Sequence, residues 1–259
     1  MKHDFPVVGD PFIPLREVDS TNNYAMARIA EGPVTAGTTW FAWRQTSGRG
    51  QRGKRWQSEA GENVMLSVVL KPLTLSISDQ FMLSASVALA LRDLVRTYTT
   101  RPVTIKWSND IYIDDKKAGG ILIENVLRGN RWTHAVVGIG LNVNQVAFPP
   151  ELPNPGSLAM ASERRYDVLE VAGKLCRSLE RRYSELVPAR FDAVLSEYTA
   201  SLYRLGETQR FSGPRELFEA TILGVEKDGK LLLDREGALL KMDFGEVSFL
   251  VGPPGSPVS

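Results

Sequence analysis

The chain has 259 residues, 43% of them hydrophobic and 24% charged, and its 31 basic residues almost balance its 30 acidic ones. This composition is typical of a globular protein of one or two domains, and a net charge of +1 excludes an overall positive field that would draw the protein to DNA or to a membrane. One cysteine excludes an intramolecular disulfide, and two histidines make a zinc site or a histidine-based triad hard to assemble.

The N-terminus carries no apolar signal core, and the sequence contains no run of about 18 apolar residues. We therefore expect a cytoplasmic protein without a membrane span. The single cysteine, Cys176, lies in an apolar helical pattern, which indicates a buried structural thiol rather than a nucleophile.

Strand and helix patterns alternate up to residue 201. Helices are predicted from Ser20, the expected N-cap, to a stop at Gly32, over 78–97 with Ser78 as the cap, and near 166–185 and 188–201. Strands are predicted at 38–43, 63–70, 103–107 and 131–144, with 111–113 and 118–126 forming a hairpin. A polar, Gly-rich loop at 44–63 and a Pro-rich loop at 145–156 interrupt this order.

The pattern changes near residue 207, where short strand patterns replace the helical ones. The turn sequences KDGK and REGA separate these strands, as they do in β-hairpins. The sequence therefore predicts a helix-containing domain at 1–205, a small β-barrel domain at 206–252, and a flexible tail at 253–259.

Two short motifs match the sequences of nucleotide-binding signatures but not the structural context that those signatures require. Residues 48–53 fit GxGxxG, but a strand rather than a helix follows, and Leu70 and Lys71 stand where a dinucleotide site needs an acidic residue. Residues 243–245 spell DFG, but the sequence contains no His-Arg-Asp loop. These contexts argue against a Rossmann site and against a kinase site.

The loop at 48–56, GRGQRGKRW, combines three glycines with four cations. Its three arginines and Lys54 cannot all be buried, because an unpaired charge in a core is too costly. Arginine binds phosphate or carboxylate through charge-assisted hydrogen bonds, and Trp56 can stack on a purine. These residues favour a nucleotide or polyphosphate ligand, while nucleic-acid binding and an ordinary solvated loop stay open at this point.

Further polar clusters stand at predicted strand ends. Residues 106–110, KWSND, place a lysine and an aspartate where side chains reach into a site, and residues 116–120, KKAGG, put Lys117 next to two glycines with open backbone amides. The stretch 138–144, GIGLNVN, has glycines that admit a planar ring and asparagines that can pair with an adenine edge. Taken singly, ion pairing on the surface or a tight turn explains each cluster equally well.

In this order and spacing, the motifs resemble those of the biotin protein ligases, over residues 15–145. The resemblance rests on Ser20-Thr21-Asn22, Gln45, Gly48-Arg49-Gly50, Trp56, residues 106–110, residues 117–120 and residues 138–142. It implies an α+β fold, with a catalytic domain related to class II aminoacyl-tRNA synthetases and lipoate ligases and a C-terminal SH3-like β-barrel. It also implies two steps: biotin's carboxylate attacks the α-phosphate of ATP to give biotinyl-5′-AMP, and a lysine of a carrier domain then displaces AMP.

The resemblance implies roles for individual residues. Catalytic roles fall to Arg49, Lys106, Asp110 and Lys117. Biotin binding falls to Ser20, Thr21, Asn22, Gln45, Arg49, Gly50, Gln51, Lys117, Gly119 and Gly120, and ATP binding to Arg49, Arg52, Trp56, Asn109 and Asn142. Mg²⁺ would accompany the substrates ATP and biotin, and Asp110 would either hold the metal or receive the proton of the incoming ammonium. The glycine-rich loop would close over the acyl-adenylate and exclude water.

Two positions depart from the family's pattern. Gln51 stands where a second loop arginine is usual, and Ser108 replaces a proline. We expect Gln51 to weaken retention of the adenylate and Ser108 only to loosen a turn. The chain lacks the N-terminal DNA-binding domain of many family members, as a monofunctional form does, so we expect no operator binding; a gel shift with biotin and ATP tests this.

The expected partner is the biotin carboxyl carrier protein of acetyl-CoA carboxylase, with the enzyme a monomer or a homodimer. A lipoate or octanoate ligase or transferase of the same fold is the main rival, but its acyl chain needs an apolar slot rather than the polar residues 20–22 and Gln45. A non-catalytic biotin or nucleotide sensor is the second alternative. Lys106, Asp110 and Lys117 argue against it, since binding alone does not need that set.

Overall fold

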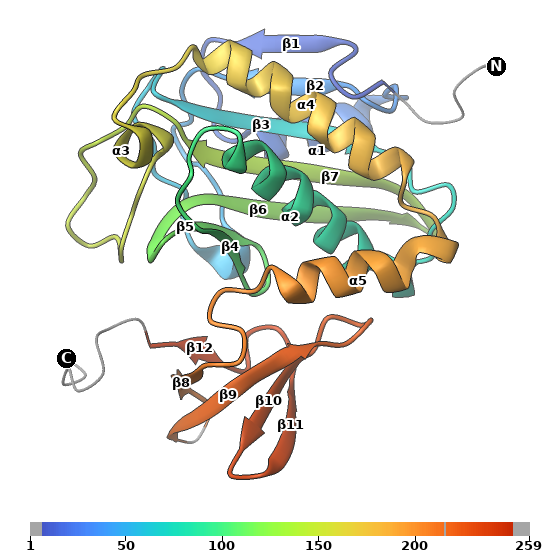
Figure 1. Cartoon of the computed structure of the whole chain (residues 1–259). Coiled ribbons are helices and arrows are strands. Elements are labelled where there is room, and N and C mark those ends of the chain that lie inside the picture. Colours follow the sequence, from blue (N-terminus) through green and yellow to red (C-terminus); the bar gives the residue numbers. More distant parts are fainter. Residues whose placement is uncertain (1–6, 215, 251–259) are drawn as a thin grey trace.

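The computed structural model describes residues 7–214 and 216–250 and arranges them around two β-sheets (Figure 1). The larger sheet has seven strands in the order β1-β2-β3-β7-β6-β5-β4. The strands are β1 Phe12–Leu15, β2 Thr39–Ala42, β3 Asn63–Leu70, β4 Val103–Lys106, β5 Asp110–Ile113, β6 Lys116–Arg128 and β7 Arg131–Asn142. The β1–β2 pair is parallel and the other pairs are antiparallel.

Helices lie on both faces of this sheet. They are α1 Thr21–Glu31, α2 Gln80–Arg96, α3 Leu158–Ser162, α4 Val168–Ser184 and α5 Phe191–Ala200, with short 3-10 turns η1 Gln51–Gly53, η2 Ile77–Asp79 and η3 Pro188–Arg190. In Figure 1, α2, α4 and α5 lie in front of the sheet and α1 lies behind it. Accordingly, α1 packs on a separate small apolar cluster that includes Trp40 and Val136.

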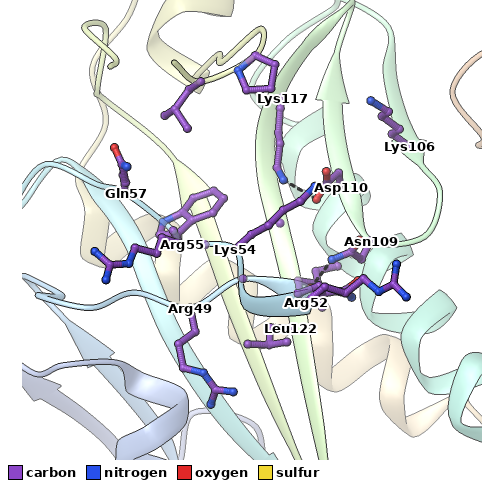
Figure 2. Close-up of a pocket in the computed structure, with 18 of the residues that line it drawn as sticks. Arg49, Arg52, Lys54, Arg55, Gln57, Lys106, Asn109, Asp110, Lys117 and Leu122 are labelled. Carbon is purple, nitrogen blue, oxygen red and sulfur yellow. Dashed lines mark hydrogen bonds and ion pairs between the residues drawn. The ribbon is translucent and has the colours of Figure 1, made fainter. Parts of the chain in front are cut away.

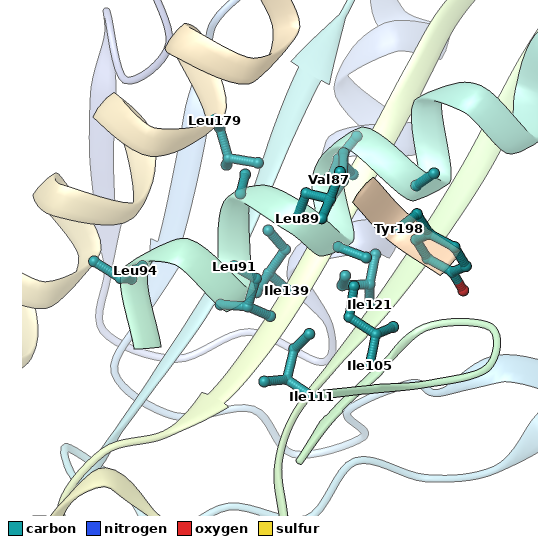
Figure 3. Packing of buried hydrophobic residues seen from close by; sticks show 14 of the residues in the cluster. Val87, Leu89, Leu91, Leu94, Ile105, Ile111, Ile121, Ile139, Leu179 and Tyr198 are labelled. Carbon is teal, nitrogen blue, oxygen red and sulfur yellow. The ribbon is translucent and has the colours of Figure 1, made fainter. Parts of the chain in front are cut away.

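The main core lies between α2 and the sheet. Figure 3 shows Leu89 and Leu91 of α2 together with Ile121 of β6 and Ile139 of β7. All four side chains are buried, and each such burial stabilises the fold by roughly 1.5–3 kcal/mol. On the opposite face, α1 covers only part of β7, and the rest of β6 and β7 is available for a binding site.

A second, antiparallel sheet of five strands follows α5, in the order β11-β10-β9-β8-β12. Its strands are β8 Thr208–Ser212, β9 Leu217–Val225, β10 Leu231–Arg235, β11 Ala238–Met242 and β12 Ser248–Phe249. The predicted α+β class with a C-terminal β-structure is thereby confirmed. The division at residues 205 and 206 remains our interpretation, and the predicted tail at 253–259 lies outside the described residues.

Side-chain contacts join the C-terminal sheet to the turn between β4 and β5. Trp107 donates its indole N–H to the carbonyl of Gly229 at 2.9 Å, and its ring centroid lies 5.8 Å from that of Phe244. In the same turn, the Tyr198 hydroxyl donates to the carbonyl of Ser108 at 2.7 Å. These contacts hold the end of the small sheet next to Lys106.

Several local details differ from the sequence predictions. The N-terminal cap before α2 is Ser76 rather than Ser78: Ser76 and Asp79 form a capping box, because the chain enters the helix through η2. Ser20 occupies the N-cap position of α1, but its side chain makes no capping hydrogen bond. Strand β1 and helix α3 were not predicted, since four and five residues are too few to show a clear period.

Two other expectations can be compared with the fold. Cys176 is 3% exposed in α4, and its burial raises the pKa of the thiol to about 11, which confirms a structural cysteine. Among the described residues, no helix combines the length and the apolar character that crossing a bilayer requires.

Candidate active site

A cavity of about 900 Å³ opens on the sheet face that α2 does not cover. A Cβ placed on Gly120 would come within 3.3 Å of the Trp56 ring, which lines this cavity. The walls come from the start of α1, the loop at 45–57, strands β5 to β7, the Pro-rich loop and residues 244–250 of the C-terminal sheet. Segments far apart in the sequence therefore share one space (Figure 2).

Most of the predicted site residues line this cavity. They are Ser20, Thr21, Asn22, Gln45, Arg49, Gly50, Gln51, Arg52, Trp56, Lys106, Asn109, Asp110, Lys117, Gly120 and Asn142. Gly119 is not among the lining residues: a Cβ there would lie 3.3 Å from Leu91 of α2. The Cβ position of Gly119 therefore faces α2 rather than the cavity, because neighbouring strand residues face opposite sides of the sheet, and its role in biotin binding stays a prediction.

One end of the cavity is a network of polar side chains, of which Thr21, Asn22 and Ser67 are buried and Gln45 is partly exposed. Gln45 Oε1 accepts hydrogen bonds from the backbone N–H of Thr21 at 2.7 Å and from its hydroxyl at 3.2 Å. The Ser67 hydroxyl lies 2.8 Å from Thr21 Oγ1 and 2.6 Å from Asn22 Oδ1. A Cβ on Gly138 would overlap Asn22, so this glycine is needed for the network to form. We call these four side chains, Thr21, Asn22, Gln45 and Ser67, the polar pocket.

Arg49 lies beside the polar pocket and is already paired. Its Nη2 lies 2.9 Å from Glu124 Oε1, and its Nη1 donates to Glu124 Oε2 at 2.9 Å and to Asn23 Oδ1 at 2.8 Å. Asn22 Nδ2 donates to the same Glu124 Oε2 at 2.9 Å. Glu124 thus links the basic loop to the polar pocket.

A lysine–carboxylate pair stands at the other side of the cavity. Lys117 Nζ lies 2.7 Å from Asp110 Oδ1, and Figure 2 shows the two side chains meeting between β5 and β6. Lys117 Nζ is also 6.0 Å from the ring centroid of Trp56. The pair is partly exposed, with 33% and 25% of the side chains accessible, so a ligand can reach both groups.

Lys106 is held among aromatic rings. Its Nζ donates to the Tyr112 hydroxyl at 3.3 Å and lies 5.2 Å and 5.1 Å from the ring centroids of Tyr112 and Phe249. Burial lowers the pKa of Lys106 to about 8, although Asp110 partly offsets this effect. A lysine that is costly to keep charged in the free protein is well suited to meet a negative charge brought by a ligand.

Trp56 lies on the glycine-lined floor of the cavity. A Cβ on Gly140 would overlap its indole ring, so the glycine allows an aromatic ring to lie against the strand backbone. Among the described residues, Trp56 Nε1 and Gln51 Oε1 are buried without a hydrogen-bond partner. Unpartnered polar atoms are costly in a closed protein interior and are common where a ligand binds.

The basic loop also reaches the C-terminal sheet. Arg52 has a left-handed backbone conformation with φ of 55°, donates Nη1 to the carbonyl of Gly245 at 2.7 Å, and lies 5.5 Å from the ring centroid of Phe244. The C-terminal sheet therefore forms part of the cavity wall and holds one end of the loop.

Two asparagines have structural partners. Asn109 Nδ2 donates to the carbonyl of Ile121 at 2.5 Å, and Asn142 Nδ2 donates to the carbonyl of Gly156 at 2.8 Å. Asn142 is 6% exposed. Both asparagines line the cavity, and each uses its side-chain amide to hold a neighbouring backbone segment in place.

The cavity is strongly positive. Its lining within the described residues contains seven basic side chains, Arg49, Arg52, Lys54, Arg55, Lys106, Lys117 and Arg210, and one acidic side chain, Asp110. No group of three His, Cys, Asp or Glu side chains in the described part of the chain could hold a metal ion by itself. This electrostatic environment favours a polyanion over a free cation.

Sequence reasoning missed Ser67, Glu124 and the C-terminal residues near Phe249. Ser67 lies within the apolar run of β3, where a polar residue is unexpected; this is the one feature of the sequence that could have indicated its role. Glu124 interrupts the apolar face of β6, but its contacts with residues 75 and 102 positions away cannot be read from local pattern. Phe249 belongs to a strand of two residues and carries no motif.

Comparison with known proteins shows the family to which the chain belongs. The Biotin/lipoate A/B protein ligase family matches residues 15–142. The chain is 31% identical over 242 residues to the biotin–acetyl-CoA-carboxylase ligase of Paracoccus denitrificans, covering 91% of this chain and 99% of that protein. It is 30% identical over 236 residues to the bifunctional ligase/repressor BirA of Bacillus spizizenii, covering 90% of this chain and 72% of that one.

A solved structure shows the same fold. The biotin protein ligase from Aquifex aeolicus in complex with biotin and ATP superposes with a TM-score of 0.76 at 28% identity, covering 93% of this chain and 99% of that one. These matches define a biotin or lipoate ligase fold. The chain belongs to the biotin protein ligases, which confirms the resemblance seen in its motifs.

Proposed function

We propose that this protein activates biotin with ATP as biotinyl-5′-AMP and transfers it to a lysine of a biotin carboxyl carrier protein, such as that of acetyl-CoA carboxylase. The observation that carries the proposal is one cavity that joins the polar pocket to the Asp110–Lys117 pair. The ureido ring of biotin needs the hydrogen-bonding groups of the polar pocket. The biotin carboxylate and the ATP phosphate repel each other, so they need Lys117 and the other basic side chains of the cavity.

In the first step, a carboxylate oxygen of biotin attacks the α-phosphorus of ATP. The bond between this phosphorus and the oxygen that bridges to the β-phosphate breaks, and pyrophosphate leaves with the electron pair. Lys117 and the loop arginines offset the repulsion between carboxylate and phosphate, and Lys106 offsets the charge that develops on the leaving group. Trp56 supports the adenine ring, and Gly140 allows the Trp56 indole to lie against the strand backbone.

Magnesium fits this scheme as part of MgATP. Mg²⁺ is usually held by one or two carboxylates together with substrate phosphates, and Asp110 is the one acidic side chain in the described lining of the cavity. Asp110 is therefore the residue that we assign to the ATP-bound metal, which supplies further positive charge at the phosphates.

In the second step, the uncharged amine of the carrier lysine attacks the acyl carbonyl carbon. The bond from this carbon to the phosphate oxygen breaks, AMP leaves, and the new amide nitrogen loses a proton. Asp110, whose carboxylate is 2.7 Å from Lys117 Nζ, is placed to accept the proton that the new amide nitrogen loses. Closure of the loop at 48–56 would keep water from the anhydride before the carrier arrives.

The lipoate or octanoate alternative fits the cavity less well. A long acyl chain offers no hydrogen-bonding group to the polar pocket, whereas a ureido ring offers both donors and an acceptor. A pure sensor would not require the catalytic pair or a buried lysine beside the phosphates. Biotin ligation therefore accounts for more of the site.

Biotin-dependent exchange of labelled pyrophosphate into ATP tests the first step without a carrier. Lys117→Ala is expected to lower the exchange rate by about 10²–10³-fold, the usual cost of removing one group that stabilises developing charge. Lys116→Ala is the matched control, because Lys116 is the adjacent, exposed lysine outside the cavity lining. Equal exchange by wild type and Lys117→Ala would contradict the assigned role.

A further inference from the structure

Glu124 is a carboxylate beside the cavity with no role in the scheme above. It lies on β6 with 23% of its side chain exposed. Both of its oxygens are engaged with the Arg49 guanidinium, each at 2.9 Å, in the two-pronged geometry that makes arginine–carboxylate pairs specific. A group placed in this way acts on the ligand through Arg49 rather than by touching it.

The pair with Glu124 determines where the guanidinium of Arg49 lies. In Figure 2, the Arg49 side chain points away from Lys117 and Asp110. Its two terminal nitrogens are shared among Glu124 and Asn23. A carboxylate or phosphate in the cavity would use the same two-pronged face of the guanidinium, so Arg49 cannot hold Glu124 and an anionic ligand with that face at once.

We propose that Glu124 is an internal counterion that competes with biotinyl-5′-AMP for Arg49 and so limits how tightly the protein retains this intermediate. The inference rests on the proposed function, because it takes the acyl-adenylate as the ligand. In the free protein Glu124 neutralises Arg49. When the adenylate binds, its phosphate displaces the carboxylate from the guanidinium, and the return of Arg49 to Glu124 favours release.

The Glu124→Gln variant tests whether Glu124 and the adenylate compete for Arg49, because glutamine has nearly the same shape as glutamate but no charge. The glutamine oxygen can still accept the hydrogen bond that Asn22 donates to Glu124, while the negative charge that attracts Arg49 is removed. Partly exposed ion pairs contribute modestly, so the dissociation constant for the adenylate is expected to fall by about two- to fivefold. If Glu124 only supported Asn22, the Glu124→Gln variant would instead bind the adenylate more weakly than the wild type.

The experiment is calorimetric titration with biotinol-5′-AMP, an analogue that keeps the phosphate and lacks the reactive acyl carbonyl. Wild type, Glu124→Gln, Arg49→Gln and the double variant form one cycle, in which the gain from Glu124→Gln must vanish once Arg49 is absent. Glu17→Gln is the matched control, since it breaks the exposed pair of Glu17 with Arg44, whose N–O distance is 2.8 Å, and is expected to leave binding unchanged.

The outcomes separate the inference from the proposed function. Tighter binding by Glu124→Gln that disappears in the Arg49→Gln background supports the counterion role. Unchanged or weaker binding, or a gain that persists without Arg49, overturns it. If Glu124→Gln does not fold, Glu124→Asp replaces it: the shorter side chain keeps the charge but cannot hold both guanidinium nitrogens, and the same gain is expected. Failure of the wild type to bind the analogue would instead overturn the proposed function.

Discussion

Replacing Lys106 with methionine is predicted to stabilise the ligand-free protein while abolishing turnover. Burial lowers the pKa of Lys106 from 10.5 to about 8, and one pKa unit corresponds to about 1.4 kcal/mol, so keeping this amine charged costs about 3 kcal/mol at pH 7. Favourable cation–π contacts with Tyr112 and Phe249 reduce this cost by about 1–2 kcal/mol. Methionine fills a similar volume without the charge, so the free energy of unfolding should rise by about 1–2 kcal/mol.

The pH dependence of this gain is the sharper test. The folded pKa of Lys106 lies below the unfolded value, so the destabilisation is fully present below pH 8 and disappears as the pH rises through 10.5. The advantage of Lys106→Met should therefore fall by about half or more between pH 7 and pH 9.5. Urea unfolding of both proteins at these two pH values measures it, with Lys116→Met as an exposed control. A loss of stability at pH 7, or an equal difference at both pH values, would refute the reasoning.

Three further substitutions test other parts of the site. Gly138→Ala places a methyl group on Asn22 and is expected to weaken biotin binding at least tenfold in calorimetry; unchanged affinity would show that the polar pocket does not bind biotin. Gln51→Arg adds a cation to the loop and is expected to slow the escape of labelled biotinyl-AMP, and no decrease would show that residue 51 does not govern retention. Arg52→Ala removes the contact with the Gly245 carbonyl and should speed that escape, with a melting temperature changed by only a few degrees; unaltered escape would mean that the C-terminal sheet does not hold the loop.

The sequence predicted best the buried strand at 63–70 and the polar clusters that line the cavity. The apolar run at 63–70 matches β3 at both ends, and the clusters at 106–110 and 116–120 lie on β4 to β6 facing one cavity. No charged or glycine-rich cluster could be assigned to a ligand by itself; their shared order and spacing made the assignment possible before their positions were known.

The details that the sequence did not predict depend on register and on distant contacts. Gly119 and Gly120 are neighbours, but adjacent residues of a strand point to opposite faces of the sheet. The pairing of β5 with β6 shifts register between Ile111 and Tyr112, so the sequence alone does not show which of the two glycines faces the cavity. Glu124 meets Arg49 only because β6 lies beneath the loop. The contribution of Phe249 depends on how the two sheets pack together, for which short strands give no signal.

The most direct test of the account is the mass of a biotin carrier domain after incubation with this protein, biotin and MgATP. The account predicts that one biotin is added to a single lysine of the carrier, that the addition requires ATP, and that it is lost with Lys117→Ala and kept with Lys116→Ala. An unmodified carrier, with no biotin-dependent pyrophosphate release, would contradict it.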